Sequence, residues 1–544
     1  MRSIWMRPPA LLLALSLVLT TGQPAFAAGD PHKVKHIIVL MQENHSFDNY
    51  FGALAYAPGS PYHAPRREDG DDRDDRSGGC RAGDHACVDG LTCRLTPAGD
   101  LACSNVNRDD DGSLVFAFHD SRRCVAPDLD HGWANTHREA NFNHPNDTLF
   151  QSLLDGFVLI NDQTEQIDKG GENATDDQTM AFYNQNEIPF YYDLAQKFAI
   201  NDRYFASVLG PTFPNRSYLL AATSFGHLTT SDSFPPPGSG GYKPITGTIF
   251  DLMEKHNVTW ADYFQDVPQG GSFRPFPSPI DPHFLPLPVF LGQIAGAPGL
   301  PPLPQVSFVD PNLGVLGITK ENDEHPPTDI QRGQAFVSRV VNAVRNSPFW
   351  QDTIILFTYD EHGGFYDHVQ PPRARQGHAP NPDGINPGQC ADLSNPPLSL
   401  QPGQGAECSA NLLSATDTTV KDAADLCPAF AADPTGPFPA SCANFDQYGI
   451  RVPFVAISAF SKPGYVSHTV GDHTSILALI EKVFMTPAAA AGDDNDDAAQ
   501  RPHLTKRDQH ADTLEDMFDF TNAPSLNTKI GVALPPAQDC TPLK

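Results

Sequence analysis

Two stretches of the chain, residues 36–41 and 353–358, are nearly continuous runs of apolar and β-branched residues. The first reads HIIVLM and the second reads TIILFT. Runs of this kind are typical of strands that are buried on both faces of a parallel sheet. A third run at 451–460, RVPFVAISAF, predicts another strand. Together these runs favour a mostly parallel sheet with helices packed on both sides.

Helical periodicity appears between the predicted strands. The segment 331–350, QRGQAFVSRVVNAVRNSPFW, places five apolar residues on one face of a helix that Pro348 ends. These residues are Phe336, Val337, Val340, Val341 and Val344. A second helix is expected after 473–475, HTS, which we expect to cap it. From residue 179 onward, this alternation predicts a fold of the α/β class.

Two segments interrupt the alternation. Residues 56–127 are rich in Cys and Asp, and we interpret them as an insertion held by disulfides, without a separate core. Residues 370–448 are rich in Pro, Gly and Cys and are expected to form a long loop excursion. Apart from these two segments, we predict a single domain over residues 28–544.

The first 27 residues have the composition of a signal peptide. Arg2 and Arg7 precede an apolar run, and Ala25-Phe26-Ala27 offers a small-x-small cleavage site. The apolar run is too short for a comfortable membrane span, and no later segment approaches about 18 uninterrupted apolar residues. We therefore expect a mature protein that begins near Ala28 and is secreted or periplasmic.

The cysteines and the net charge indicate where the protein functions and which partners it lacks. The ten cysteines fit an exported protein with disulfides, and none has the CxxC or Cys/His spacing of a zinc site. Five lie within 80–124 and five within 390–540, so at least one bridge joins the groups if all are paired. The formal net charge of −29 argues against a basic surface for nucleic acid, and no nucleic-acid partner is expected.

Polar side chains follow two of the predicted strands at the point where each ends. Glu43 and Asn44 follow the first run, and Asp360 and Glu361 follow the second. Because the carboxyl ends of parallel strands meet at one edge of a sheet, these side chains are expected to lie together. Neighbouring carboxylates repel unless a cation or proton intervenes, and oxygen ligands suit hard divalent ions. A polar loop or a surface charge cluster is the alternative for either segment taken alone.

A candidate nucleophile, Thr212, lies between Pro211 and Phe213-Pro214. In the plainer interpretation, Thr212 caps a helix that starts near Pro214. A helix N-terminus also attracts phosphate through its free N–H groups and its dipole. A hydroxyl at that place attacks phosphorus when a metal lowers its pKa. The residues alone leave both interpretations open.

Four segments together resemble one known family. They are HIIVLMQENHSFDNYFG at 36–52, GPTFPNR at 210–216, SPFWQDTIILFTYDEHGGFYDHV at 347–369 and GDHTSILALIEKVF at 471–484. They resemble the bacterial phosphoesterases, which comprise phospholipases C and an acid phosphatase branch, and the plant non-specific phospholipases C. All of these belong to the alkaline phosphatase-like superfamily. The resemblance implies a mostly parallel sheet sandwiched by helices, in a single phosphoesterase catalytic domain with a Cys-rich loop insertion.

The resemblance also implies roles for individual residues. Residues that match the family's metal ligands are Glu43, Asn44, Asp360 and Glu361, with the oxygen of the nucleophile Thr212 completing the set. His131 and His325 match histidines that contact the phosphoryl group or protonate the leaving group. Thr328 stands near the place where many relatives have a further histidine. The remaining histidines of the matched motifs, His362, His368 and His473, are expected to be structural or to support the ligands.

The function implied by the resemblance is that of a secreted, metal-dependent phosphoesterase. Phospholipase C, acting through a phosphothreonine intermediate, is the leading hypothesis, and an acid phosphatase acting on phosphomonoesters is the alternative. A catalytically inactive lipid-binding protein is a remote third reading. One divalent ion is expected: calcium, magnesium, manganese or zinc. The expected partner is a phospholipid or a small phosphate ester, with transient contact at a membrane surface.

Overall fold

A computed structural model of the protein describes most of the chain. The described residues are 29–65, 79–124, 128–146, 153–161, 176–233, 240–276, 281–316, 321–374, 382–387, 426–427, 429, 439, 442–487 and 501–540. The predicted signal peptide and most of the loop excursion at 370–448 lie outside them. No helix within the described ranges has both the length and the apolar composition that crossing a membrane requires.

The core of the fold is an eight-stranded sheet with the order β10-β9-β11-β1-β12-β13-β8-β14. Its strands are β1 (His36–Gln42), β8 (Ala199–Asn201), β9 (Trp260–Phe264), β10 (Phe284–Pro286), β11 (Val306–Val309), β12 (Thr353–Tyr359), β13 (Phe454–Ser458) and β14 (Val466–Ser467). All neighbouring pairs are parallel except those that involve β13. The predicted mostly parallel sheet is therefore confirmed.

The strand predicted at 451–460 is shorter than expected and runs against its neighbours. It spans Phe454–Ser458 and pairs antiparallel with both β12 and β8. Pro453 lacks an N–H and cannot donate to the ladder, so the regular strand begins after it. Arg451 forms only an isolated bridge with Phe205. An apolar run alone does not reveal the direction of a strand.

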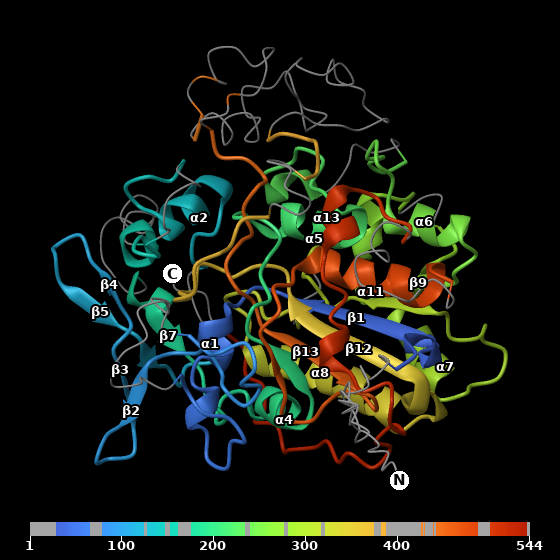
Figure 1. Ribbon diagram of the computed structural model, residues 1–544, viewed down its shortest axis with the longest axis horizontal. Helices are drawn as coiled ribbons and strands as arrows, with labels where there is room; N and C mark the ends of the chain where they lie inside the picture. Colours follow the sequence, from blue (N-terminus) through green and yellow to red (C-terminus); the bar gives the residue numbers. More distant parts are fainter. Residues whose placement is uncertain are drawn as a thin grey trace, which may run out of the picture.

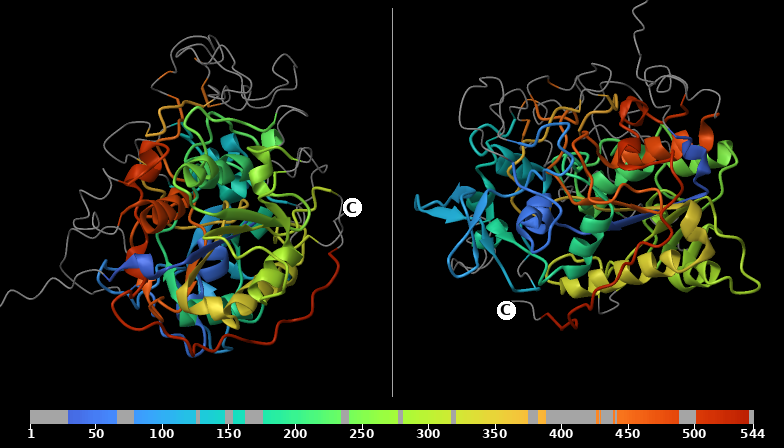
Figure 2. Two further views of the ribbon diagram at one scale, coloured as in Figure 1. Left: turned by 90° about the vertical axis from the view of Figure 1, so that its right-hand side faces the viewer. Right: turned by 60° about the horizontal axis from the view of Figure 1, so that its bottom comes forward.

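Helices cover both faces of the sheet, as predicted (Figures 1 and 2). One face carries α5 (Thr212–Ala221), α6 (Ile249–Lys255), α11 (His473–Met485) and α13 (Lys506–His510), and the other carries α4 (Pro189–Lys197), α7 (Leu287–Ile294) and α8 (Ile330–Arg345). Two further helices, α1 (Phe47–Phe51) and α2 (Trp133–Ala140), lie beyond the carboxyl ends of the central strands, at the left of Figure 1.

The two helices predicted from periodicity are both present. In α8, all five residues of the predicted apolar face are buried. Its end at Arg345 is followed by a 3-10 turn over Pro348–Asp352, as expected from the proline. In α11, the N-cap is Asp472 and not the predicted 473–475 segment, because Asp472 and Ser475 cap each other's backbone N–H groups.

The insertion is built from short hairpins and disulfides. Strands β2 (Cys93–Leu95) and β3 (Leu101–Cys103) form one hairpin, β4 (Val106–Arg108) and β5 (Leu114–Phe116) form another, and β6 (Phe118–His119) pairs with β7 (Ala181–Phe182). A disulfide between Cys93 and Cys103 crosses the first hairpin. Such hairpins bury little apolar surface, so the covalent bridge supplies the constraint.

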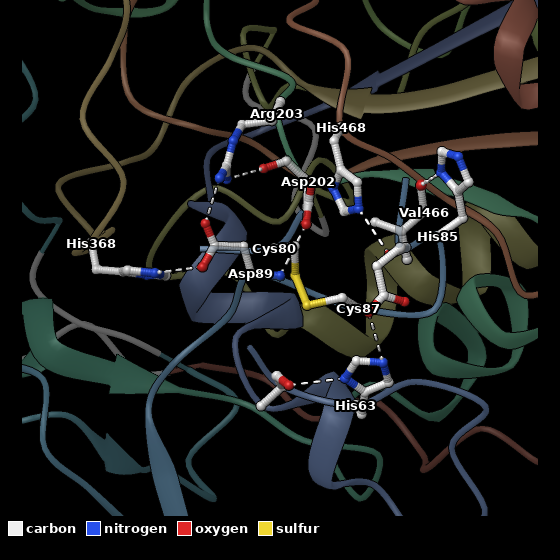
Figure 3. Close-up of a disulfide and its surroundings, with 12 residues drawn as sticks. His63, Cys80, His85, Cys87, Asp89, Asp202, Arg203, His368, Val466 and His468 are labelled. Atoms are coloured by element: carbon white, nitrogen blue, oxygen red, sulfur yellow. Dashed lines mark hydrogen bonds and ion pairs between the residues drawn. A yellow bond between two sulfur atoms is a disulfide. The ribbon is translucent and has the colours of Figure 1, made fainter. Parts of the chain in front are cut away.

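A second disulfide, Cys80–Cys87, lies where the insertion meets the edge of the main sheet (Figure 3). The backbone N–H of Val466 in β14 donates to the carbonyl of His85 at 2.9 Å, and His85 Nδ1 donates back to the Val466 carbonyl at 2.8 Å. Asp89 forms an ion pair with Arg203 at 2.7 Å. The insertion therefore covers an edge strand that would otherwise be open to another chain.

A third bridge, Cys124–Cys540, joins the two cysteine groups. This confirms that at least one disulfide connects them. The tail that carries Cys540 also contacts the start of α8, where the Gln538 N–H donates to Asp329 Oδ2 at 2.7 Å. The fourth described bridge is Cys427–Cys442, and the two other cysteines lie outside the described residues.

The charge of His368 should make the stability of the fold depend on pH. Burial alone would lower its pKa, but Asp48 at 2.6 Å and Asp89 at 3.3 Å outweigh burial and the nearby Arg451, and raise it to about 10. Because this folded-state pKa exceeds the ordinary 6.5, the contribution is complete below pH 6.5 and is lost as pH rises toward 10. His368→Gln should lower the free energy of unfolding by about 2 kcal/mol at pH 6.

Urea unfolding at pH 6 and pH 9.5 measures this effect. The difference between wild type and His368→Gln should shrink as pH rises. His144 is exposed, and His144→Gln is the control, with little effect at either pH. A difference that grows with pH would contradict the assigned charge on His368.

Candidate active site

The register of the two central strands brings the four predicted metal ligands together. Strands β1 and β12 are parallel neighbours, with Gln42 opposite Tyr359. The next residues, Glu43-Asn44 and Asp360-Glu361, therefore leave the sheet side by side, and all four are buried. Asn44 Nδ2 donates to Glu361 Oε1 at 2.7 Å. The two acidic strand ends form one site, as their sequence pattern predicts.

The turn after Glu361 depends on glycine. Gly363 has a φ of +62°, and a Cβ there would lie 2.1 Å from the Asn44 carbonyl oxygen. The backbone N–H of Gly363 donates to Glu361 Oε2 at 2.7 Å. Only glycine allows this close approach in this conformation, so the turn holds the Glu361 carboxylate against the end of β1.

Thr212 is the first residue of α5, and Pro211 occupies the N-cap position. The interpretation of Thr212 as the N-cap of a helix near Pro214 is therefore wrong, because the helix begins two residues earlier. One turn further along α5, Arg216 reaches the acidic strand ends. Its Nη2 lies 2.8 Å from Glu43 Oε1, and its Nε donates to Asp360 Oδ2 at 3.0 Å. Helix α5 thus presents a hydroxyl and a cation to the same site.

These groups line a cavity of about 630 Å³. Thr212, Arg216 and Glu43 lie on its wall together with His131 and His325. Another part of the wall is apolar and consists of Phe213, Leu220, Val267, Phe273, Leu313 and Val315. The predicted nucleophile, both predicted catalytic histidines and one predicted metal ligand therefore share a single cavity.

The two cavity histidines are oriented in the same way. His131 Nδ1 donates to the Leu129 carbonyl at 2.7 Å, and His325 Nδ1 donates to the Pro326 carbonyl at 2.7 Å. Each ring is fixed by its own loop, which leaves Nε2 to face other groups. His131 Nε2 lies 3.7 Å from Glu361 Oε1, and His325 Nε2 lies 3.6 Å from Asp128 Oδ2.

Carboxylates keep both imidazoles protonated at neutral pH. Burial lowers the pKa of His131, but Glu361 and Asp128 outweigh it and raise the pKa to about 9. The pKa of His325 is also raised to about 9, because Asp128, Glu43 and other acids overcome burial. Two cationic N–H donors at a cavity wall can bind phosphoryl oxygens or give a proton to a leaving group.

The donor set at the strand ends fits a hard divalent cation. Asn44 Oδ1 is buried and lacks a hydrogen-bond partner among the described residues, which leaves a free acceptor. Burial raises the pKa of Asp360 to about 8, and repulsion from Glu43 and Glu361 adds to this while Arg216 opposes it. A bound cation would relieve that repulsion and use the free amide oxygen.

A second group on the cavity wall could also hold a metal. Ligand atoms of Asp128, His131 and His325 lie within 4.8 Å of one another. Nitrogen ligands suit zinc and other transition metals better than calcium or magnesium. The carboxylate and amide group matches the predicted ligands, whereas this group contains both predicted catalytic histidines.

The three other histidines of the matched motifs lie away from the cavity lining. His362 lies 2.8 Å from Glu139 through Nε2 and 3.1 Å from Glu361 through Nδ1. His473 Nε2 donates to the Asp360 carbonyl at 2.7 Å. These two rings contact Glu361 and Asp360 without lining the cavity. His368 contacts neither of them and forms ion pairs with Asp48 and Asp89.

Sequence reasoning gave no role to Arg216 or Asp128. Arg216 is four residues after Thr212, and this i, i+4 spacing places both on one helical face once the helix is known to start at Thr212. Asp128 lies three residues before His131 in an irregular loop. No periodicity links Asp128 to His325, so only the folded chain reveals their proximity.

Comparison with known proteins identifies the family of the chain. The model of the Phosphoesterase family matches residues 34–487. Non-specific phospholipase C1 of Arabidopsis thaliana is 28% identical over 510 residues, which cover 91% of this chain and 73% of that protein. Phospholipase C A of Mycobacterium tuberculosis (strain ATCC 25618 / H37Rv) is 26% identical over 541 residues, which cover 94% and 82%.

Among solved structures, the similarity is distant. Ps i-CgsB matches with a TM-score of 0.28 and 11% identity, over 57% of this chain and 68% of that one. The phosphonate monoester hydrolase SpPMH from Silicibacter pomeroyi matches with a TM-score of 0.25 and 11% identity, over 55% and 68%. Scores this low do not bear on function.

All four segments on which the resemblance rests lie within residues 34–487, the range that the family model matches. The match therefore confirms the resemblance. The mostly parallel α/β fold and the disulfide within the insertion are shown by the structure itself. The chain belongs to the phosphoesterase family, and it is a hydrolase that acts on phosphoric ester bonds.

Proposed function

We propose that the protein is an exported phospholipase C, which cleaves the phosphodiester of a phospholipid on the glycerol side. The observation that carries this proposal is the cavity in which Thr212, two imidazolium groups and the strand-end carboxylate of Glu43 meet beside an apolar wall. Export rests on the predicted signal peptide and on the four described disulfides.

The metal site in this proposal consists of Glu43, Asn44, Asp360 and Glu361, with the Thr212 oxygen as a further ligand. One divalent ion, either calcium, magnesium, manganese or zinc, would act there as a Lewis acid that lowers the pKa of the hydroxyl and stabilises charge on phosphorus. Arg216 holds Glu43 and Asp360 in position from α5. Three carboxylates, one arginine and a divalent ion are together neutral, so an anionic ester is not repelled.

Thr212 is the nucleophile in the proposed reaction. Its hydroxyl gives its proton to water, its oxygen forms a bond to phosphorus, and the bond from phosphorus to the glycerol oxygen breaks. Diacylglycerol leaves and a phosphothreonine remains. Water then attacks the phosphothreonine, which releases the phosphorylated head group and restores the hydroxyl. The N-terminal N–H groups of α5 favour the phosphate throughout.

His131 and His325 complete the proposed mechanism. As imidazolium groups they donate hydrogen bonds to the equatorial phosphoryl oxygens, where charge develops in the transition state. One of them gives its proton to the glycerol oxygen as that oxygen leaves, and water restores the proton. Asp128 keeps His325 charged and oriented for this step.

Because part of the cavity wall is apolar, we expect a mutation there to affect lipid substrates more than small soluble esters. Phe273 is buried at this wall and contacts the ring of Phe213 at 6.4 Å between centroids. Phe273→Ala should raise KM for a long-chain phospholipid in mixed micelles by about tenfold, because apolar surface of the substrate stays in water. The kcat/KM for p-nitrophenyl phosphorylcholine should change less than about threefold.

Leu300 is an exposed apolar residue that does not line the cavity, and Leu300→Ala is the matched control. If Phe273→Ala lowered kcat/KM equally for the lipid and for the soluble ester, the apolar wall would not have the proposed role in binding lipid.

The first test compares the purified mature protein on p-nitrophenyl phosphorylcholine and p-nitrophenyl phosphate between pH 4.5 and 7.5, with divalent ions supplied. Faster diester cleavage, followed by release of diacylglycerol from whole lipid, is the expected result. Faster monoester cleavage would assign the protein to the acid phosphatase alternative with the same residues. Inactivity on both esters would favour the metal-dependent lipid-binding protein.

A further inference from the structure

The residue between two cavity residues, Glu324, is completely buried. Its neighbours Asp323 and His325 both line the cavity, whereas the Glu324 side chain points away from it into the protein. A buried carboxylate is unfavourable unless hydrogen bonds satisfy its oxygens. The hydrogen-bond partners of Glu324 therefore indicate what this residue does.

Three tyrosine hydroxyls donate to the Glu324 carboxylate, and each comes from a different element. Tyr50 of α1 donates to Oε2 at 2.6 Å, and Tyr359, the last residue of β12, donates to Oε2 at 2.7 Å. Tyr191 of α4 donates to Oε1. The Tyr50 ring packs against the other two, at 5.9 Å from Tyr191 and 5.3 Å from Tyr359 between centroids. Hydrogen bonds to a carboxylate are stronger than those between neutral groups.

The backbone around Glu324 is tied to the metal-ligand strand. The N–H of Glu43 donates to the Asp323 carbonyl at 2.8 Å, and His45 Nε2 lies 3.2 Å from the Glu324 carbonyl oxygen. Glu324 has a φ of +80°, a conformation that is unfavourable for any residue with a Cβ. The three hydroxyls and the two backbone contacts hold it in that conformation.

Helix α8 leaves room for this side chain at Gly333. A Cβ at Gly333 would lie 2.1 Å from Glu324 Cγ and 2.2 Å from its Oε1. Glycine inside a helix is unfavourable relative to alanine, so its presence in the first turn of α8 calls for a packing reason. The close approach of Glu324 supplies that reason.

From these contacts we propose that Glu324 is a positioning residue for His325. Its carboxylate, held by three tyrosines, fixes the turn from which the His325 ring extends, and it ties that turn to β1 and β12, which carry the metal ligands. This inference rests on the proposed function in one respect, namely that His325 takes part in turnover. It assigns a task to a buried acid that does not touch the substrate.

The test is a double-mutant cycle between Glu324→Gln and His325→Asn, with p-nitrophenyl phosphorylcholine or p-nitrophenyl phosphate as substrate. Glu324→Gln keeps the shape but replaces one acceptor oxygen by an amide NH2 group, so at least one tyrosine hydroxyl loses the oxygen to which it donates. In the wild-type background it should lower kcat by about 30-fold, with metal content and KM unchanged. In the His325→Asn background the same change should lower kcat less than about twofold, because the imidazole that Glu324 positions is then absent.

A second pair of variants tests the packing around Glu324 while Glu324 itself is unchanged. Gly333→Ala places a methyl group against Glu324 Cγ and should lower kcat by about tenfold, again only when His325 is present. Gly292→Ala in α7 is the matched control. Its Cβ would lie 2.6 Å from the terminal Cδ1 of the exposed Leu300, which can move, and at an ordinary contact distance of 3.8 Å from Ala297 Cβ. If Glu324→Gln does not fold, Tyr191→Phe and Gly333→Ala carry the same cycle.

Each outcome of the cycle has one meaning. A loss that depends on His325 supports the positioning role. An equal loss in both backgrounds, or a loss that follows the metal content, shows a general structural role and overturns the inference. Full kcat in His325→Asn alone removes the part of His325 in the proposed function, and the inference with it. If His325→Asn is impaired and the cycle is additive, only the inference fails.

Discussion

Thr212→Ala is expected to lower turnover of phosphate esters by at least about 10⁴-fold, because it removes the oxygen that forms the bond to phosphorus. Thr212 is partly exposed at the first position of α5, so loss of its hydroxyl should change the free energy of unfolding by less than about 0.5 kcal/mol. Single-turnover assays with the diester and thermal unfolding of the same preparations measure the two effects.

Thr212→Ser is the matched control, since it retains a hydroxyl at the same place. It should keep turnover within about tenfold of the wild type and accumulate a phosphorylated serine on acid quenching. Substantial turnover by Thr212→Ala would show that water or another residue attacks phosphorus, and the mechanism would have to be assigned to a different nucleophile.

The second large effect is expected for Asp360→Asn. This change removes one of three carboxylates from the proposed metal site and leaves the Arg216 Nε without an anionic partner there. The affinity for a divalent ion should fall by about 100-fold, and activity at limiting metal should fall with it. Metal per protein chain after gel filtration, together with calorimetric titration of the metal-free protein, measures this directly.

Asp281 forms a comparable ion pair, with Arg274 Nε at 3.0 Å, but does not line the cavity. Asp281→Asn is therefore the control and should bind metal as the wild type does. Unchanged metal affinity in Asp360→Asn would move the metal away from the strand ends. The group of Asp128, His131 and His325 would then be the next place to test.

The parts of the fold that the sequence predicts are those with strong local patterns. The buried runs that became β1 and β12 and the apolar face of α8 all persist in the structure. The meeting of Glu43 with Asp360 follows from one rule, that parallel strands end at the same edge. The direction of β13 was not predicted, because a buried run has the same composition whether its neighbours are parallel or antiparallel.

The contacts that sequence reasoning missed are made between segments far apart in the chain. Arg216 reaches Asp360 across 144 residues, and Tyr191 reaches Glu324 across 133. Each residue alone is ordinary: an arginine in a helix, a glutamate in a polar loop. Their importance comes from burial, which makes an unpaired charge unfavourable and so requires a partner. Burial of that kind is a property of the folded chain.

The bridge from Cys124 to Cys540 has a consequence for the order in which the protein is completed. Its two cysteines are separated by 416 residues, and the tail that carries the second one also contacts Asp329, four residues after His325. A ribosome releases residues in order, so this bridge can close only after Cys540 has emerged. The contact of this tail with Asp329, close to His325 of the cavity, can therefore form only after the strand ends that carry Glu43 and Asp360 have been made.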